Sequence, residues 1–362
     1  MNRLSTYLLK LFAAEAAALF GVALTILYLV QTLRIVDIDA VRDRGIGTLL
    51  WQTMLAVPQL AIAFMYVCIA IGLARVLRAL QASRELHIIH VAQLLPTLIR
   101  AILVYAAIGT VMVLILAHVI EPAAKREANL LRSQAAADLV GRSLVPNRFA
   151  ELGDGVTVTV GGRGRNGEIT SFFADDQRDP NTRRTYIADS ALITSDELGY
   201  VLQLQNGTIQ YRRTDGQFSE ISFDRYDIAL ERLTGDTDPG ERRGDLSTWA
   251  MVSEALELGE WPAESLRRIA ERTADGFRVL GLCLLVCAIA GFPSGRRREP
   301  RIPLEIVVLG AVLFERAILT YLPFGGWAQQ VVPVVGLLVV ALVLLAVRLR
   351  LFAPTPVEAH SA

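Results

Sequence analysis

The sequence has few of the residue types from which catalytic and metal sites are usually built. Its 362 residues include only four histidines and three cysteines, and none of them lies in the long polar block from about Glu121 to Thr273. A histidine general base, a cysteine nucleophile, a disulfide framework and most zinc sites are therefore excluded from that block. We predict no catalytic residue and no metal site in this chain.

Net charge and a nucleotide-binding loop are absent as well. Basic and acidic residues number 36 each, so no overall positive field attracts nucleic acid. The chain has no Gly-x-x-x-x-Gly-Lys-Ser/Thr loop, and we expect no cofactor bound to it. The acidic pair Asp175/Asp176 is compatible with the active site of a carboxylate-only glycosidase. However, Asp176 to Pro180 is more typical of a turn between strands.

Long apolar runs make up most of the remaining sequence. Because 53% of the residues are hydrophobic and 20% are charged, the charge must be segregated. The first run follows Arg3 and Lys10, lacks a clear cleavage site and is predicted to be an uncleaved span. Six runs are long enough to cross a bilayer, three on each side of the polar block: about Leu11–Leu33, Trp51–Leu73, Leu94–Ile120, Asp275–Phe292, Pro303–Leu322 and Gln330–Val347.

These runs define the predicted domains. Residues 1–120 form the first three transmembrane helices, and residues 121–272 form a separate domain with flanking helical segments. Residues 273–350 form the last three transmembrane helices, and residues 351–362 form a disordered tail.

The polar block shows the period of two that is typical of β-strands. Hydrophobic and polar residues alternate along Val156–Val160 and Tyr226–Leu230, which places one face of each strand on a core. Asn206-Gly207 and Asp215-Gly216 are predicted hairpin turns. Seven to nine short strands with turns between them favour an all-β sandwich or jelly roll, and a helical pattern returns from about Asp245 to Arg272.

The distribution of Lys and Arg predicts the orientation in the membrane. Eleven basic residues lie near the span ends on one side, and only Arg34, Arg42 and Arg44 lie in the short loops on the other. The positive-inside rule then places both termini in the cytoplasm and the β domain outside.

Four stretches in this topology resemble the LptF/LptG permease family of the lipopolysaccharide export ABC transporter, with the LptF branch favoured over the LptG paralogue. They are Thr32–Gly47, Ala82–Ala92, Gly167–Leu192 with its Asp-Gln-Arg-Asp-Pro turn, and Phe223–Leu230. The resemblance implies an inner-membrane permease subunit with a periplasmic β-jellyroll. It also implies four partners: a paralogous LptG-type subunit, an LptB-type ATPase dimer that binds ATP and Mg, an LptC-type bridge protein and lipopolysaccharide itself.

The resemblance also implies a coupling helix at about residues 83–90, which would dock in a groove of the ATPase. Ser83 is expected to cap this helix, and Glu85 lies near its positive end, with Arg84 between them. Leu86 and Ile89 are three residues apart and are expected to fill the groove. The alternative is a solvated turn at the membrane surface.

Four arginines are candidates for contacts with lipid phosphates: Arg34, Arg42, Arg44 and Arg316. A charge at the bilayer centre costs roughly 2.5–3.5 kcal/mol, so Arg316 should face a cavity or a counter-ion. Its alternative is an ion pair with Glu315 or Glu15, and the alternative for the loop arginines is snorkelling. Glu15 is expected to make a polar contact between helices.

The competing interpretation, from another functional class, is that the whole chain is a membrane-anchored periplasmic enzyme.

Overall fold

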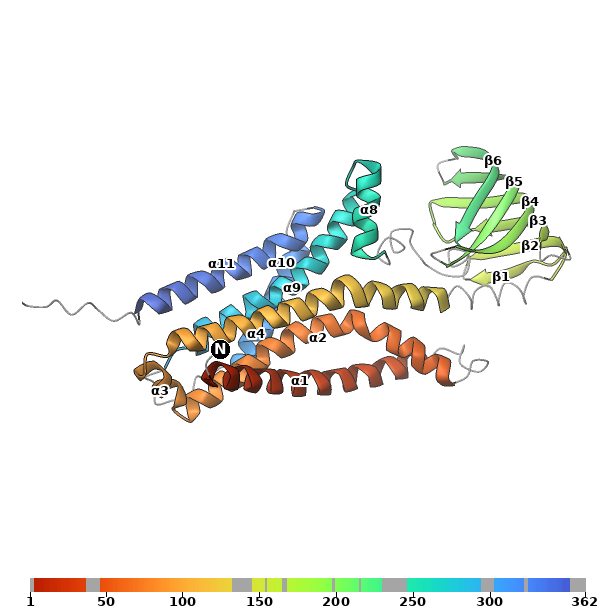
Figure 1. The fold of residues 1–362 in the computed structure, drawn as a ribbon. Helices are drawn as coiled ribbons and strands as arrows, with labels where there is room; N and C mark the ends of the chain where they lie inside the picture. Colours follow the sequence, from red (N-terminus) through yellow and green to blue (C-terminus); the bar gives the residue numbers. More distant parts are fainter. Residues whose placement is uncertain are drawn as a thin grey trace, which may run out of the picture. The chain divides into compact units, whose positions relative to one another are not determined.

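The computed structural model describes residues 3–36, 46–131, 145–153, 155–164, 168–196, 199–214, 216–229, 246–293, 303–321 and 325–351. The chain divides into two units, a helical unit (Met1–Ala124 with Leu246–Ala362) and a β unit (Lys125–Asp245) (Figure 1). The predicted tail after Leu351 lies outside the described residues.

The helical unit contains helices in all six places where the sequence predicts a span. Five of the described helices are long and apolar enough to cross a membrane. The sixth, α10, has 18 residues and includes three charged ones, Glu305, Glu315 and Arg316. The helices are α1 (Arg3–Val36), α2 (Ile46–Ala82), α3 (Glu85–Val91), α4 (Leu95–Ile115), the π-helical η2 (Leu116–Ile120), α8 (Thr248–Leu258), α9 (Ala263–Ala290), α10 (Leu304–Tyr321) and α11 (Trp327–Leu351).

The longest difference from the predicted spans is in α9, which begins at Ala263, 12 residues before the expected start at Asp275. Glu264 forms ion pairs with Arg267 at 2.7 Å and with Arg268 at 3.2 Å. Pairs at these helical spacings stabilise a polar helix end. The predicted boundary at residue 273 therefore falls inside one continuous helix.

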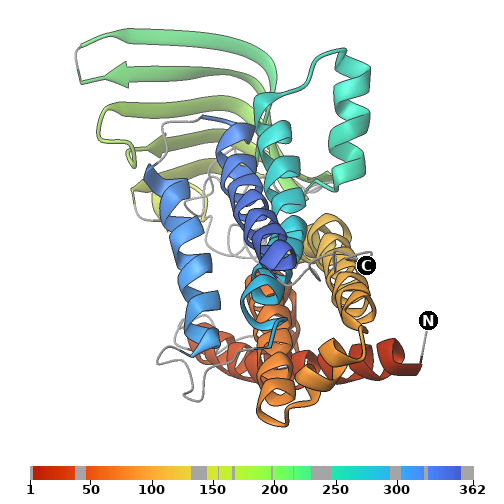
Figure 2. The same cartoon turned by 90° about the vertical axis from the view of Figure 1, so that its left-hand side faces the viewer.

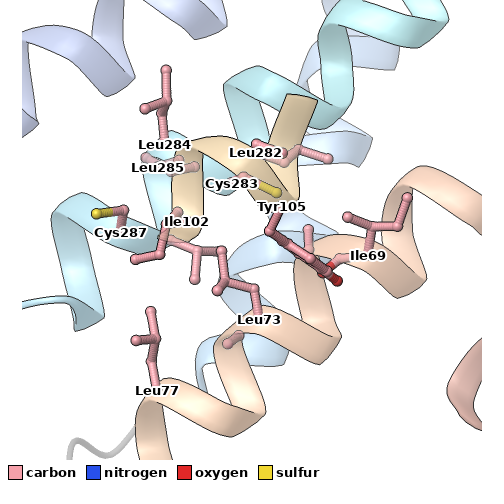
Figure 3. Close-up of a cluster of buried hydrophobic side chains, with 14 of the residues drawn as sticks. Ile69, Leu73, Leu77, Ile102, Tyr105, Leu282, Cys283, Leu284, Leu285 and Cys287 are labelled. Atoms are coloured by element: carbon pink, nitrogen blue, oxygen red, sulfur yellow. The ribbon is translucent and has the colours of Figure 1, made fainter. Parts of the chain in front are cut away.

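Side chains from most of the described helices form the core of the helical unit. Phe12 of α1, Leu73 of α2, Ile102 of α4 and Leu282 of α9 are all fully buried. Figure 3 shows Leu73, Ile102 and Leu282 together with Cys283 and Cys287, which point into the same apolar cluster. The two cysteines pack there as small hydrophobic residues.

Small residues allow α1 and α2 to approach closely. A Cβ atom at Gly72 would lie 2.8 Å from the backbone nitrogen of Ala16. Glycine at this position is therefore required by the crossing of the two helices, as is common where transmembrane helices pack.

The β unit is one antiparallel sheet whose six described strands follow in chain order. The strands are fewer and longer than the sequence predicts, and the described pairing is that of a meander without a Greek-key crossover. The turn at Asp176–Pro180 is confirmed, since one strand ends at Asp176 and the next begins at Thr182. The strands are β1 (Ala150–Gly153), β2 (Val156–Arg163), β3 (Ile169–Asp176), β4 (Thr182–Asp196), β5 (Gly199–Arg213) and β6 (Phe218–Ala229).

The predicted hairpin at Asn206-Gly207 is wrong, because both residues lie inside β5. Asn206 does have a positive φ of 49°. A Cβ atom at Gly207, however, would lie 2.3 Å from the carbonyl oxygen of Ile187 on β4, so this glycine permits a close approach of two strands. The second predicted turn, which contains Gly216 with a φ of 87°, does separate β5 from β6.

A crease crosses five strands of the sheet at one level. The ladder pairing skips one residue in each strand there, and the skipped residues are Gly161, Ser171, Asp189, Asn206 and Asp224. The core-facing residues switch between even and odd numbers across the crease. In β5 they are Leu202 and Leu204 before it and Ile209 after it, and in β4 they are Tyr186 and Ala188 before it and Ala191 after it.

Both sides of the crease contribute to one apolar core. Val158, Phe172 and Ile209 come from one side, and Ile169, Leu202 and Leu204 from the other, and all are buried. The strands bend over in Figure 2. A single sheet therefore folds onto itself and buries a face that ordinarily needs a second sheet to cover it.

Candidate functional site

The predicted coupling helix forms as α3, and a two-residue turn joins it directly to α2. Arg84 has a left-handed conformation with a φ of 61°, and its N–H donates to the carbonyl of Gln81 at 3.1 Å. The expected cap by Ser83 is wrong. Its N–H donates to Ala79 and its hydroxyl to Leu80, so Ser83 completes the end of α2 and its hydroxyl does not reach the N–H groups of α3.

The structure reverses the expected faces of α3. Leu86 and Ile89 are 0% and 7% exposed and belong to the core of the helical unit, so the expectation that they fill a partner's groove does not hold. Ile88 and Val91 are 67% and 86% exposed. Both pairs have a spacing of three, and the sequence alone does not say which of them faces inward. The outward face of α3 consists of Glu85, His87, Ile88 and Val91.

A second contact fixes the end of α2 where α3 begins. The side-chain amide of Gln81 donates to the backbone carbonyls of Ala290 at 3.1 Å and Phe292 at 3.0 Å, at the end of α9. The α2–α3 turn is thus tied to a second long helix. The start of α3 is therefore attached to two long helices, α2 and α9.

Arg316 of α10 lies beside two groups that the sequence did not suggest as partners, Asp275 and Tyr66. Its Nη2 lies 3.6 Å from Asp275 Oδ1 and donates to the hydroxyl of Tyr66 at 3.3 Å. Its side chain is 42% exposed. Glu15 pairs instead with Arg75 of α2 at 3.5 Å, which confirms the expected polar contact between helices.

Glu315 forms a buried ion pair with Arg278 of α9. The Nε atom of Arg278 donates to both carboxylate oxygens of Glu315, at 2.8 and 2.9 Å, and the side chains are 0% and 4% exposed. Arg278 also contacts Asp275 one turn earlier. We use the term charged cluster for Asp275, Arg278, Glu315 and Arg316, whose formal charges sum to zero.

Sequence reasoning missed Asp275 and Arg278. Both lie at the predicted start of a span, where charged residues are ordinary. Their i, i+3 spacing at the edge of an apolar run was the available indication of an ion pair along one helix face. The partner on α10 depends on tertiary packing.

The side chains of the remaining arginine candidates are not among those that the structure describes. Arg34 lies in the last turn of α1, and its side chain is not among those described. Arg42 and Arg44 lie outside the described residues.

Arginines hold Asp175 and Asp176 of the β unit as anions. Asp175 accepts hydrogen bonds from Arg183 at 2.7 and 2.8 Å, from Gln177 and from Thr185, and these bonds, led by that of Arg183, lower its pKa. Burial alone would raise the pKa of Asp176, but hydrogen bonds from Arg178 outweigh burial and lower it. A glycosidase general acid needs a raised pKa, so neither carboxylate suits that role.

Asp175→Asn is expected to reduce the free energy of unfolding of the β unit by about 1–3 kcal/mol at pH 7, because charged hydrogen bonds to Arg183 are lost. The carboxyl pKa is lower in the folded state, so its contribution is full above the ordinary value of 3.8 and disappears as the pH falls further. The difference from wild type should therefore shrink at pH 3. Pulse proteolysis of the full chain measures both.

Asp227→Asn is the matched control for this variant. Asp227 pairs with Arg225 at 2.9 Å, but the two side chains are 40% and 65% exposed. Such surface pairs contribute little, about 0–1 kcal/mol. Equal losses in the two variants would contradict our account of Asp175.

The comparison with protein families agrees with this architecture. Residues 6–353 match the family described as lipopolysaccharide export system permease LptF/LptG. No curated protein matches the sequence at a significant level. Because the match covers nearly the whole chain, from the first helix to the last, the chain belongs to the LptF/LptG family of lipopolysaccharide export permeases.

Proposed function

We propose that this chain is the LptF-type subunit of the exporter and works opposite an LptG-type paralogue. Family membership already makes it a transporter subunit of the inner membrane, within a complex that includes an ATPase. In our proposal an LptB-type ATPase dimer binds ATP and Mg, and this chain binds neither.

The outward face of α3 carries this proposal. Leu86 and Ile89 anchor the helix in the bundle, and this leaves Glu85, Ile88 and Val91 exposed on a rigid support. An apolar pair beside a carboxylate fits a groove with a basic rim on a partner protein. Ile88 and Val91 would fill the groove, and Glu85 would meet the basic residue, with Ser83 and Arg84 in the turn that aims the helix.

We infer that α10 is a sixth membrane span although it has three charged residues. Each of them has an ionic partner on another helix: Glu305 pairs with Arg78, Glu315 with Arg278, and Arg316 with Asp275. The opposite face exposes apolar side chains such as Ile306, Leu309 and Leu313. Charges that are paired with neighbouring helices, on a helix whose opposite face is apolar, meet the requirements of a bilayer.

Six spans place both termini on the same side of the membrane. The positive-inside count then favours the cytoplasm for the termini and the periplasm for the β unit. Cysteines placed at Ser83 and Ser219 test this orientation. A reagent that does not cross the membrane should label position 219 in intact spheroplasts and should label position 83 only after lysis.

The creased sheet supports a role for the β unit in lipid transfer. Its two halves enclose an apolar interior, which suits acyl chains, and β6 is an edge strand of the described sheet. An edge strand offers free backbone groups for pairing with a neighbouring β domain. We propose that an LptC-type bridge protein pairs at such an edge.

Arg316 is our strongest candidate for a contact with a lipid phosphate. Its guanidinium is held in place by Asp275 and Tyr66 while much of the side chain stays exposed. Arginine binds phosphate through paired hydrogen bonds of fixed geometry. Arg34, Arg42 and Arg44 remain candidates on the same side of the membrane.

Purification of the chain from native membranes tests the proposed function. An ATPase subunit and a second permease should copurify, and a photo-crosslinker at position 316 should capture lipopolysaccharide in that complex. A chain that purifies alone contradicts the transporter assembly. Capture at the exposed position 313 but never at 316 would show that Arg316 has a structural role only.

A further inference from the structure

Helix α10 is attached to the rest of the helical unit by a narrow buried stripe and by ion pairs at both ends. The stripe consists of Leu304, Val308 and Val312, which are buried, whereas other faces of the helix expose Ile306 and Leu313. In Figure 2 this helix, in medium blue, stands at the margin of the helical unit.

The ion pairs at the two ends connect α10 to different helices. Near its start, Glu305 Oε2 accepts a hydrogen bond from Arg78 Nη1 of α2 at 3.0 Å, with both side chains about one-third exposed. Near its other end, Glu315 is bound by the fully buried Arg278 of α9. An aliphatic stripe permits sliding along the helix axis, whereas an ion pair fixes one register.

Arg78 also lies close to α3 along the chain. Helix α2 ends at Ala82, and the turn of Ser83 and Arg84 leads directly into α3 at Glu85. Backbone hydrogen bonds hold this turn, from Ser83 N to Ala79 O at 2.9 Å and from Arg84 N to Gln81 O at 3.1 Å. Arg78 therefore belongs to the same helix end that carries α3.

We propose that the Arg78–Glu305 pair transmits the movement of α3 to α10, while the buried Arg278–Glu315 pair holds the far end of α10 as a pivot. Arg78 and Glu305 are positioning residues for lipid extraction. This inference rests on the proposed docking of α3 on an ATPase. It predicts that loss of the pair uncouples ATP hydrolysis from extraction without preventing either subunit from assembling.

Charge reversal in the complete complex tests the inference. Arg78→Glu and Glu305→Arg, each in proteoliposomes loaded with lipopolysaccharide, should lower the lipid extracted per ATP hydrolysed by about tenfold, and the double variant should recover most of it. The rate of ATP hydrolysis should stay close to wild type. A merely structural pair would lower both quantities together.

Arg75→Glu is the matched control, because Arg75 lies one turn from Arg78 on the same helix and pairs with Glu15 of α1 at 3.5 Å. It should leave extraction per ATP unchanged. Normal coupling in both single reversals, or no recovery in the double variant, overturns the inference. If the reversals fail to assemble, Arg78→Gln decides: reduced coupling supports the inference and unchanged coupling overturns it.

The same preparations separate this inference from the proposed function. Glu85→Arg should stop extraction if α3 docks on the ATPase. A loss with Glu85→Arg but normal coupling with Arg78→Glu rejects only the transmission by Arg78. Normal extraction with Glu85→Arg rejects the docking itself.

Discussion

Glu85→Arg, as the sole copy of this chain, is expected to leave the complex assembled in the membrane but to abolish lipid export. Glu85 is exposed in the first turn of α3, so the reversal costs the helix only about 0.3–1 kcal/mol through its dipole. Leu86 and Ile89 still hold the helix in the core. A like-charge contact in the interface, by contrast, costs several kcal/mol.

Growth of the mutant strain and copurification of the ATPase measure the two halves of this prediction. Glu257→Arg is a suitable control, because Glu257 is also an exposed helical glutamate but lies on α8. Ile88→Asp should reproduce the export defect, since it places a charge on the exposed apolar face. Normal growth with Glu85→Arg would remove α3 from the coupling path.

The helices and the β unit could be predicted from the sequence because each depends on local pattern. Apolar runs such as Trp51–Leu73 determine a span by length, and the alternation along Val156–Val160 determines a strand by period. The number of strands was harder to predict. Ser171 and Asn206 bend strands that continue beyond them, and a positive φ inside a strand has the same sequence signature as a turn.

The candidate site was less predictable because its geometry depends on contacts between distant segments. The helix predicted at about residues 83–90 is present as α3, but which of its faces points inward depends on the bundle against which Leu86 packs. Glu315 is adjacent to Arg316 in sequence, but neighbouring residues on a helix point in different directions. Glu315 therefore meets Arg278, and Arg316 meets Asp275.

Arg278→Met is expected to be the most destabilising single change in the helical unit, by about 3–5 kcal/mol, because it leaves the buried carboxylate of Glu315 without its cation. Glu315 would lose its Arg278 ion pair, and Asp275 would keep Arg316 at 3.6 Å. Thermal unfolding of the purified chain in detergent measures the loss. Arg75→Met, which removes a half-exposed arginine, should cost about 1 kcal/mol or less.

The double variant Arg278→Met/Glu315→Leu separates two effects on stability. One is the destabilisation caused by an unpaired buried carboxylate, and the other is the stabilisation contributed by the ion pair itself. Apolar replacements of a buried ion pair are often neutral in stability, and Nη2 of Arg278 has no hydrogen-bond partner among the described residues. We therefore expect the double variant to regain most of the stability that Arg278→Met loses. If it unfolds as early as the single variant, the pair itself stabilises the bundle. If it is stable but exports poorly, the charges are retained to hold α10 in register, since packing alone would then suffice for folding but not for transport.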